Sequence, residues 1–363
     1  MFEPRKKTRT VKIGQYLIGG KNPIRIQSMT NTFTKNIKAT LEQIDKLAEN
    51  GCEIVRVAVP DMETGKKLSE LNRQSPLPLV ADIHFDYRLA LMALDAGFTA
   101  LRINPGNILK KNEQDILDTK PIDVLAKQIL ACGASVRVGV NSGSVEKDLL
   151  DKYGHPSPEA LVESALRHTA YLEERGVTQI KVSIKSSSVT DTIKANMLLS
   201  EKTDYPIHLG VTEAGTPIRG SVKSALGIGS LLLQGIGDTI RVSLTANPVE
   251  ELAVAKEILR SSGARQIGAE LISCPTCGRT EIDLIALAEK IEEKLIELPD
   301  NLKVAVMGCV VNGPGEAKEA DIGLAGGRGK GVIFKKGTVI HSIQGEENLL
   351  QTFMAELDKL KKV

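Results

Sequence analysis

The sequence predicts an α/β fold: a TIM (β/α)8 barrel followed by a small α+β domain. Short β-branched runs alternate with helical stretches from residue 23 to about residue 247, and there are eight such runs. After Gly263 the alternation stops, and a segment with three cysteines follows. Alternating strands and helices imply parallel strands, and eight such units close a barrel of ~250 residues.

The barrel strands are expected at the β-branched runs, and the helices at the stretches between them. The runs are Ile24–Gln27, Ile54–Val59, Leu79–His84, Ala100–Asn104, Ser135–Asn141, Gln179–Ser186, Ile207–Thr212 and Thr239–Thr245. Apolar residues in the intervening stretches recur at helical spacing, as at Leu161, Ala165 and Leu166. Glycines that follow these stretches suit the left-handed position that ends a helix; they are Gly51, Gly97, Gly133, Gly176, Gly235 and Gly263. The polar segment 142–158 is interpreted as a surface insertion.

The last hundred residues predict a separate small domain. It holds a helix at Glu281–Glu297, a strand at Lys303–Met307, glycine-rich turns, two short strands and a terminal amphipathic helix at Glu346–Leu360. A hundred residues is a normal size for a domain. We therefore expect a barrel domain at residues 1–263 and an α+β domain at residues 264–363.

Composition excludes several classes of protein. The 363 residues include 47 Lys and Arg against 45 Asp and Glu, so the net charge is only +2, which argues against a dedicated nucleic-acid binder. Aromatic residues make up 3% of the chain, too few for base-stacking platforms. We expect no signal peptide and no membrane span, because residues 1–10 are polar and basic. Five cysteines in so long a chain fit a reducing cytoplasm, where cysteine clusters bind metals or take part in catalysis.

Polar side chains alternate with apolar ones along four of the predicted strands. Arg102 and Asn104 flank Ile103, and the same alternation recurs at Arg137 to Asn141, Lys181 to Lys185, and Arg241 to Thr245. The outer face of a barrel packs against helices, so the basic set is expected to point inward. Buried cations need a negative partner, and the only carboxylates at strand ends are Asp82 and Glu213. A phosphorylated ligand at the C-terminal end of the barrel would neutralise them.

A half-exposed sheet would show the same alternation, so this alternative stays open. Other residues at strand ends join the candidates for the site: Gln27, Arg56, His84, Asn107 and Thr212. His84 can equally be a histidine satisfied within the protein. The run Asn-Pro-Gly-Asn at 104–107 can equally be a tight turn between a strand and a helix.

The cysteines of the second domain predict a metal centre. Cys274 and Cys277 form a Cys-x-x-Cys pair, and Cys309 lies in a Gly- and Pro-rich segment that ends at Glu316. Glu316 is the nearby candidate for a fourth ligand. Cys52 and Cys132 precede strands, at the other end of the barrel, and are expected to be small buried residues. Spacing alone leaves both a structural zinc site and an iron–sulfur cluster open.

At these residues the chain resembles the bacterial 4-hydroxy-3-methylbut-2-en-1-yl diphosphate synthases, a family of the non-mevalonate isoprenoid pathway. The resemblance covers nearly the whole chain. Its most specific motifs are Cys274-Pro-Thr-Cys277-Gly-Arg279, Cys309-Val-Val-Asn-Gly-Pro-Gly-Glu316, Gly210-Val-Thr-Glu213-Ala-Gly215, Arg102-Ile-Asn104-Pro-Gly-Asn107 and Arg137-Val-Gly-Val-Asn141. The chain has no room for the extra domain that some plant members insert, so it resembles the two-domain bacterial form.

The resemblance implies a 4Fe–4S cluster held by Cys274, Cys277, Cys309 and Glu316. It implies 2-C-methyl-D-erythritol 2,4-cyclodiphosphate as the substrate and a two-electron reductive ring opening with loss of water. It further implies a flavodoxin or a ferredoxin as electron donor. A head-to-tail homodimer would place the cluster of one chain over the barrel of the other.

With this resemblance, the inward-facing residues receive expected roles. Arg56, Arg102, Arg137, Lys185 and Arg241 would bind the diphosphate, and Asn104, Asn141, Thr212 and Ser243 would complete the hydrogen bonds. Glu213 would be the proton donor, and Asn312 of the partner chain would touch a substrate oxygen. Two rival hypotheses remain: a barrel aldolase or pterin-type transferase with a zinc-stapled appendage, and an iron–sulfur electron carrier. A carrier needs no basic pocket, and acid-labile sulfide would exclude the zinc alternative.

Overall fold

The computed structural model describes residues 4–108, 110–111, 117–295, 298–309 and 317–361. The chain divides into two compact units, Met1–Arg265 and Gln266–Val363, and each is described by itself below. Over the described residues, every helix is too short or too polar to cross a membrane.

The first unit is a parallel barrel of eight strands. Its strands are β3 (Arg25–Met29), β4 (Ile54–Ala58), β5 (Leu79–Asp82), β6 (Ala100–Ile103), β9 (Ser135–Asn141), β10 (Ile180–Lys185), β11 (His208–Leu209) and β12 (Thr239–Ile240). They pair in the order β10-β9-β6-β5-β4-β3-β12-β11, and a single bridge between Val182 and Ile207 joins the two ends. The eight predicted strands are confirmed, although β11 and β12 end earlier than the apolar runs do.

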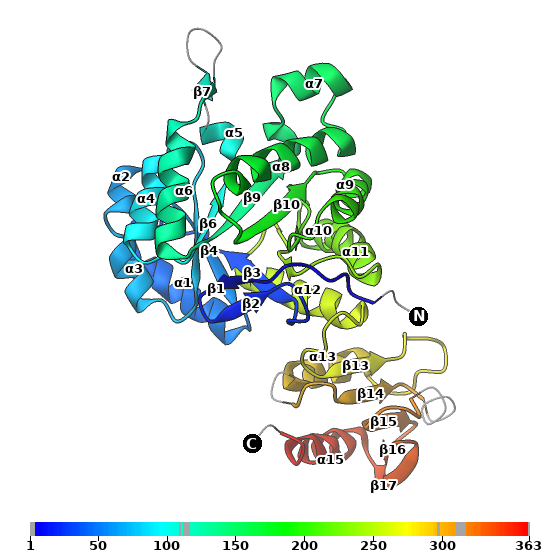
Figure 1. Ribbon diagram of the computed structural model, residues 1–363. Helices are drawn as coiled ribbons and strands as arrows, with labels where there is room; N and C mark the ends of the chain where they lie inside the picture. Colours follow the sequence, from blue (N-terminus) through cyan, green and yellow to red (C-terminus); the bar gives the residue numbers. More distant parts are fainter. Residues whose placement is uncertain (1–3, 109, 112–116, 296–297, 310–316, 362–363) are drawn as a thin grey trace. The chain divides into compact units, whose positions relative to one another are not determined.

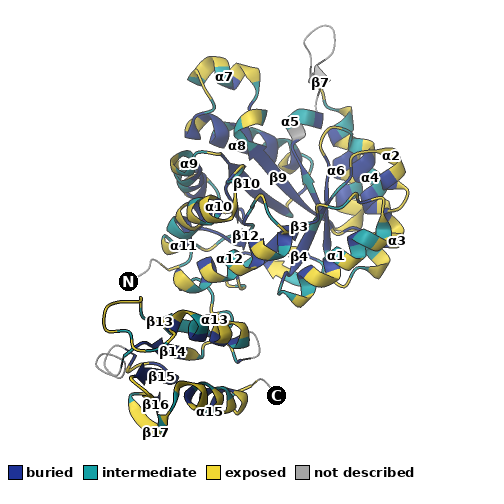
Figure 2. Ribbon diagram, turned by 180° about the vertical axis from the view of Figure 1, so that it is seen from behind, coloured by how far each residue is buried: buried dark blue, intermediate teal, exposed yellow. Residues whose placement is uncertain are grey.

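Helices cover the outside of the barrel (Figure 1). Figure 2 shows their buried faces turned to the strands and their exposed faces turned outward. The six glycines expected to end helices all have positive φ, between 60° and 85°. The helices are α1 (Ile37–Glu49), α2 (Met62–Gly65), α3 (Leu68–Gln74), α4 (Tyr87–Asp95), α5 (Pro105–Ile108), α6 (Lys120–Cys132), α7 (Lys147–Tyr153), α8 (Pro158–Glu173), α9 (Val189–Lys202), α10 (Pro217–Ser224), α11 (Ser230–Leu233) and α12 (Pro248–Ser261).

Two hairpins and one short helix were not expected. The hairpin of β1 (Val11–Ile13) and β2 (Tyr16–Ile18) precedes the barrel. Its buried side chains pack on Ile54, Val80 and Ala100 at the beginnings of three barrel strands, so it closes the N-terminal end of the barrel. A second hairpin pairs β7 (Lys110–Lys111) with β8 (Leu117–Asp118). The segment interpreted as an insertion contains α7 and a 3₁₀ turn at Ser142–Ser144.

Arg265, the last residue of the barrel unit, binds residues at the N-terminal end of the barrel. Its Nη1 donates to the carbonyl of Ile24 at 2.7 Å, just before β3. The same nitrogen lies 2.7 Å from Glu53 Oε2, just before β4, and Glu53 also binds Arg25. The chain therefore leaves the barrel at the end opposite the C-terminal ends of the strands.

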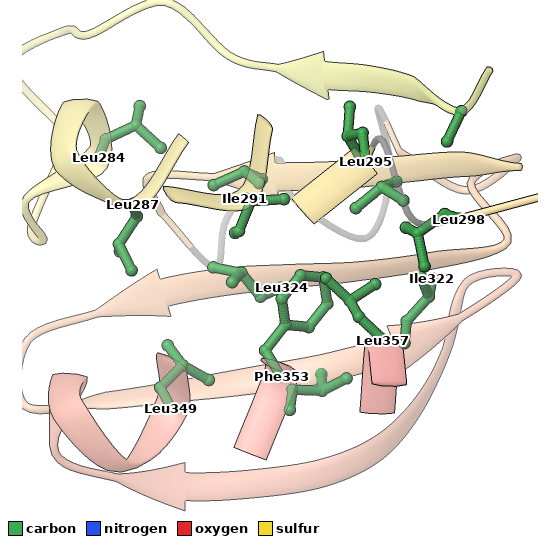
Figure 3. Close-up of a cluster of buried hydrophobic side chains, with 14 residues drawn as sticks. Leu284, Leu287, Ile291, Leu295, Leu298, Ile322, Leu324, Leu349, Phe353 and Leu357 are labelled. Atoms are coloured by element: carbon green, nitrogen blue, oxygen red, sulfur yellow. The ribbon is translucent and has the colours of Figure 1, made fainter. Parts of the chain in front are cut away.

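In its described residues, the second unit has a five-stranded mixed sheet and helices on it. Its strands, in sheet order, are β13 (Glu270–Ser273), β14 (Lys303–Met307), β15 (Ile322–Gly327), β16 (Lys330–Lys335) and β17 (Thr338–Gln344). Helices α13 (Leu284–Lys294) and α15 (Glu346–Asp358) contribute side chains to a core that also includes Ile322 and Leu324 of the sheet (Figure 3).

The glycine-rich segment that was expected to form turns includes residues that form strand β15, so the prediction was wrong there. A Cβ at residue 323 would lie 2.3 Å from Phe334 Cζ, and one at residue 326 would lie 2.4 Å from Ile282 Cδ1. Both glycines are therefore needed because large side chains lie directly across the strand, and not because the chain turns there.

Candidate functional site

Charged side chains of neighbouring barrel strands form one continuous row inside the barrel. Strand pairing sets Asp82 beside Arg102, Arg102 beside Arg137, and Arg137 beside Lys181. Paired residues of parallel strands share an orientation, so the alternation seen in the sequence turns all four inward. The Val, Ile and Leu residues between them are buried on the opposite, helix-facing side.

A cavity of about 230 Å³ opens above this row, at the C-terminal ends of the strands. Eight of the predicted substrate-binding residues line it: Arg56, Arg102, Arg137, Asn141, Lys185, Thr212, Arg241 and Ser243. His84, a further candidate from the sequence, also lines it, as do Met29, Asp82, Ser183 and Val211. The half-exposed sheet is excluded, because the basic residues come together in one enclosed place.

Asp82 is the carboxylate among the residues that line the cavity. Arg102 Nη1 lies 3.3 Å from its Oδ1, and Arg56 Nε lies 3.5 Å from its Oδ2. Burial acts to raise the pKa of Asp82, but the neighbouring Arg56, Arg102 and Arg137 outweigh it and hold the pKa below its usual value. Asp82 is therefore ionised, and it is shared by several cations.

Two cations of the cavity have no such partner. In the described part of the chain, no carboxylate lies within 4.0 Å of Arg137 or Lys185. Burial, and then the positive charges around them, lower the pKa of both side chains well below the usual values. Five cationic side chains line the cavity against one carboxylate, so it is built to receive negative charge.

Glu251 of α12 contacts a cation of the cavity, and sequence reasoning missed it. Its Oε1 lies 3.4 Å from Arg241 Nη2 and accepts a hydrogen bond of 3.0 Å from the backbone N–H of Leu244. Burial raises the pKa of Glu251, against the effect of Arg241. In the sequence it occupies an ordinary place in the first turn of a helix, where acidic residues are common.

Two motif glycines make room for the cations. A Cβ on Gly139 would lie 2.6 Å from Arg102 Nε, and a Cβ on Gly210 would lie 2.5 Å from Lys185 Nζ. Each long side chain therefore crosses a neighbouring strand at the one position that lacks a side chain.

Asn104 and Glu213, two of the predicted site residues, do not line the cavity, and neither do the candidates Gln27 and Asn107. Asn104 is 1% exposed, and its Oδ1 accepts a hydrogen bond from the N–H of Gly106 at 3.1 Å. Glu213 is exposed and has a left-handed φ of 51°. It directly follows Thr212, which does line the cavity. Asn312 lies outside the described residues.

The cysteines of the second unit gather at the ends of two paired strands. Cys274 directly follows β13, and Cys309 follows β14 by two residues. The N–H of Gly308 points at Cys274 Sγ at 3.2 Å, and the N–H of Glu281 donates to the carbonyl of Gly308 at 3.1 Å. Hydrogen bonds from Arg279 and Thr280 lower the pKa of the Cys277 thiol, with that from the Arg279 backbone the strongest.

This arrangement fits a thiolate-bound metal centre in its donor chemistry, although no three acidic, cysteine or histidine side chains among the described residues already form a closed metal-binding group. Glu316 lies outside the described residues. Cys52 is buried, as expected, and burial raises its pKa to about 12. Cys132 is exposed, which corrects the expectation of a buried residue; it is the last residue of α6 and faces outward.

Fold and site together define a barrel protein that binds a small multiply charged anion and carries a cysteine-bearing α+β unit. Residues 8–256 match the family described as the GcpE TIM-barrel domain, and residues 270–359 match the GcpE protein C-terminal domain. The chain belongs to the GcpE family.

Two close relatives carry the same name, 4-hydroxy-3-methylbut-2-en-1-yl diphosphate synthase (flavodoxin). The protein from Maridesulfovibrio salexigens is 58% identical, over 99% of this chain and 98% of its own. The protein from Lawsonia intracellularis is 59% identical, over 98% of this chain and 97% of its own. Among solved structures, Yersinia pestis dihydropteroate synthase matches 70% of this chain and 99% of its own, with a TM-score of 0.46 and 12% identity. That last likeness says nothing about activity.

Proposed function

We propose that this protein catalyses the reductive ring opening and dehydroxylation of 2-C-methyl-D-erythritol 2,4-cyclodiphosphate to 4-hydroxy-3-methylbut-2-enyl diphosphate. The reaction breaks the ring bond between carbon and a phosphate oxygen, removes a hydroxyl as water, and forms a carbon–carbon double bond. It consumes two electrons and a proton. The observation that carries the proposal is the cavity with five cationic side chains, in a chain of the GcpE family.

The cations of the cavity would bind and orient the two phosphate groups. Arg137 and Lys185, which have no carboxylate partner, gain most from an anion, whereas Arg56 and Arg102 already share Asp82. Asn141, Thr212 and Ser243 add neutral hydrogen-bonding groups around the same space. Asn104 is buried, and its Nδ2 finds no hydrogen-bond partner among the described residues, so a small shift of its turn would let the Nδ2 bind the substrate.

Glu213 is proposed as the proton donor. It sits next to Thr212 on a segment held by two hydrogen bonds, from Thr212 N–H to the carbonyl of Ser186 and from Thr245 N–H to the carbonyl of Gly215. A strained, exposed residue beside a binding pocket can turn inward when ligand enters, because its present conformation is costly. Asn312 would contact a substrate oxygen.

Cys274, Cys277 and Cys309, with Glu316, are proposed to hold a 4Fe–4S cluster. When bound, such a cluster supplies electrons one at a time and an iron with one exchangeable ligand that can accept an oxygen of the substrate. The N–H of Gly308, aimed at Cys274 Sγ, is of the kind that tunes the potential of a cluster. A flavodoxin or a ferredoxin of the cytoplasm would deliver the electrons, and the names of the relatives print flavodoxin.

The working assembly is proposed to be a head-to-tail homodimer. Arg265 holds the end of the barrel unit at the N-terminal end of the strands, while the cavity lies at the other end. Only four residues separate Arg265 from Glu270, where β13 begins, and four residues span at most ~14 Å. A barrel strand of seven residues is ~23 Å long. This favours a site that is completed by the cysteine-bearing unit of a second chain.

Anaerobic purification followed by iron and sulfide analysis, and then assay with the cyclic diphosphate and a reductant, tests the reaction. Zinc without acid-labile sulfide would contradict it.

Subunit mixing tests the dimer. A Glu213→Ala chain and a Cys309→Ser chain should each be inactive alone and recover part of the activity when mixed and reassembled. No recovery, despite demonstrated heterodimers and an intact cluster in the Glu213→Ala chain, would favour a site completed within one chain.

A further inference from the structure

His168 lies in the middle of α8, and the proposed reaction assigns it no role. It is 1% exposed, although it belongs to a helix on the outside of the barrel. Its Nε2 lies 3.0 Å from Glu146 Oε1, and Ser164 of the same helix donates a hydrogen bond of 2.6 Å to Glu146 Oε2. Burial acts to raise the pKa of Glu146, but the contacts with His168 and Ser164 outweigh it and lower the pKa to about 2. Glu146 is therefore a firmly ionised anchor.

The imidazole also packs against the turn that follows β6. A Cβ on Gly106 would lie 2.8 Å from both Cε1 and Nε2 of His168. Gly106 does not have a left-handed φ, so this position needs glycine for space alone. The turn is otherwise held by its own residues, because Asn104 Oδ1 accepts from Gly106 N–H and the Asn104 carbonyl accepts from Asn107 N–H.

The two segments that His168 touches belong to neighbouring strands and border the cavity. The first begins two residues after Arg102, which lines the cavity. The second runs from Asn141, another lining residue, to Glu146. It is braced by Ser144 Oγ, which both accepts from the N–H of Asn141 and donates to its carbonyl. Figures 1 and 2 both show α5, in the first segment, beside α8.

We propose that His168 is a positioning residue that fixes these two segments relative to each other and so sets the place of Asn141, which lines the anion cavity, and of Asn104, two residues beyond the lining residue Arg102. It gives a reason for the glycine in the run Asn-Pro-Gly-Asn, whose φ does not itself require glycine. The inference rests on the proposed function in one respect, namely that the cavity binds the diphosphate.

The test enlarges the side chain at one of the two contacting residues and shortens it at the other. Gly106→Ala places a methyl group against the imidazole, and His168→Ala leaves a gap beside the turn. Each single change should weaken the binding of inorganic pyrophosphate, measured by calorimetry, at least fivefold. In the cluster-loaded enzyme each should raise KM more than it lowers kcat. The double variant should bind more tightly than either single variant, because the new methyl group occupies the space that the imidazole leaves.

His168→Gln keeps a polar side chain of intermediate size beside Glu146 and the turn, and it should retain more of the affinity than His168→Ala. If His168→Ala fails to fold, His168→Gln takes its place in the binding measurements. Leu172→Ala, one turn further along α8 and equally buried, is the control for lost stability. It should lower the thermal midpoint without changing pyrophosphate affinity.

Three results would overturn the positioning role: single variants that bind like the wild type, a double variant as weak as the two single effects multiplied, or a control as weak as His168→Ala. If the wild type itself fails to bind pyrophosphate, the anion site of the proposed function falls, and this role falls with it.

Discussion

The guanidinium of Arg102 lies across the bare backbone of Gly139, so close that a Cβ on residue 139 would stand 2.6 Å from Arg102 Nε. From there Arg102 reaches Asp82 and, at 3.4 Å, the carbonyl of Gly139. The glycine in Arg137-Val-Gly-Val-Asn141 therefore belongs to the anion cavity, although it offers the ligand no side chain.

Gly139→Ala should displace Arg102 and weaken pyrophosphate binding by about 1.5 kcal/mol, the lower end for a lost charge-assisted contact. Calorimetric titration measures the affinity. Gly143→Ala is the matched control, because nothing lies within 4 Å of a Cβ there. Equal affinities of the two variants would contradict the role given to Gly139.

Lys185→Met should have opposite effects on binding and on stability. Pyrophosphate binding should weaken by about 1.5–3 kcal/mol, because a charge-assisted contact is lost. The ligand-free protein should unfold at a higher temperature, because a desolvated lysine, for which the described residues offer no carboxylate, is replaced by an apolar side chain of similar length. Thermal melts with and without pyrophosphate measure both, and Lys127→Met, on the exposed face of α6, is the control. A lower melting temperature without ligand would contradict the argument.

Lys181 should make stability depend on pH. Its Nζ is buried without a hydrogen-bond partner beside Arg137 and His208, and Asp238 is already held by Arg5, Thr8 and the N–H of Ile207. Burial, and then Arg137, lower its pKa well below the usual value. Between that lowered pKa and about 10.4, the unfolded chain binds a proton that the folded chain does not.

The free energy of unfolding should therefore rise with pH in this window, by at most ~1.4 kcal/mol per pH unit from this group. Urea titrations from pH 7 to pH 9 should show a steeper rise for the wild type than for Lys181→Met. Comparing the two proteins cancels the contribution of Cys52, because both contain it. Its raised pKa makes the free energy of unfolding fall at alkaline pH. Parallel curves for the two proteins would show that Lys181 is charged in the folded state.

Cysteine variants should separate the metal centre from the other thiols. Cys274→Ser, Cys277→Ser and Cys309→Ser should lose bound iron and acid-labile sulfide, because serine is a poor ligand for iron–sulfur clusters. Cys52→Ser and Cys132→Ser should keep both. Loss of iron in Cys52→Ser, together with unchanged iron in Glu316→Ala, would show that the ligands are assigned wrongly.

Periodicity was enough to predict the barrel and most of the cavity lining. Arg102, Arg137 and Lys185 occupy alternate positions on neighbouring strands. The other positions are apolar and face the helices, so these basic side chains must face the barrel interior. Site residues that do not belong to the alternating positions of a strand could not be predicted in this way. Glu251 binds Arg241 from a helix, and Met29 accepts hydrogen bonds from Arg56 through its sulfur, as an apolar residue that carries no polar signal.

Two other features could not be predicted from the local sequence. Glu213 follows a strand in the sequence, but its left-handed φ takes it out of the alternation. Strand β15 contains glycines because of two side chains outside that strand, Phe334 and Ile282, and no pattern within the strand contains that information.

The surplus of cations at the cavity also governs how quickly a ligand arrives. The whole chain carries a net charge of only +2, so its distant field is weak. Five cations set in a narrow, low-dielectric opening concentrate their field there and attract a multiply charged phosphate in the final approach. Mobile ions screen this attraction over a length of ~8 Å at physiological ionic strength. The capture rate of the cyclic diphosphate should therefore fall as salt is added, while that of an uncharged molecule of the same size stays constant.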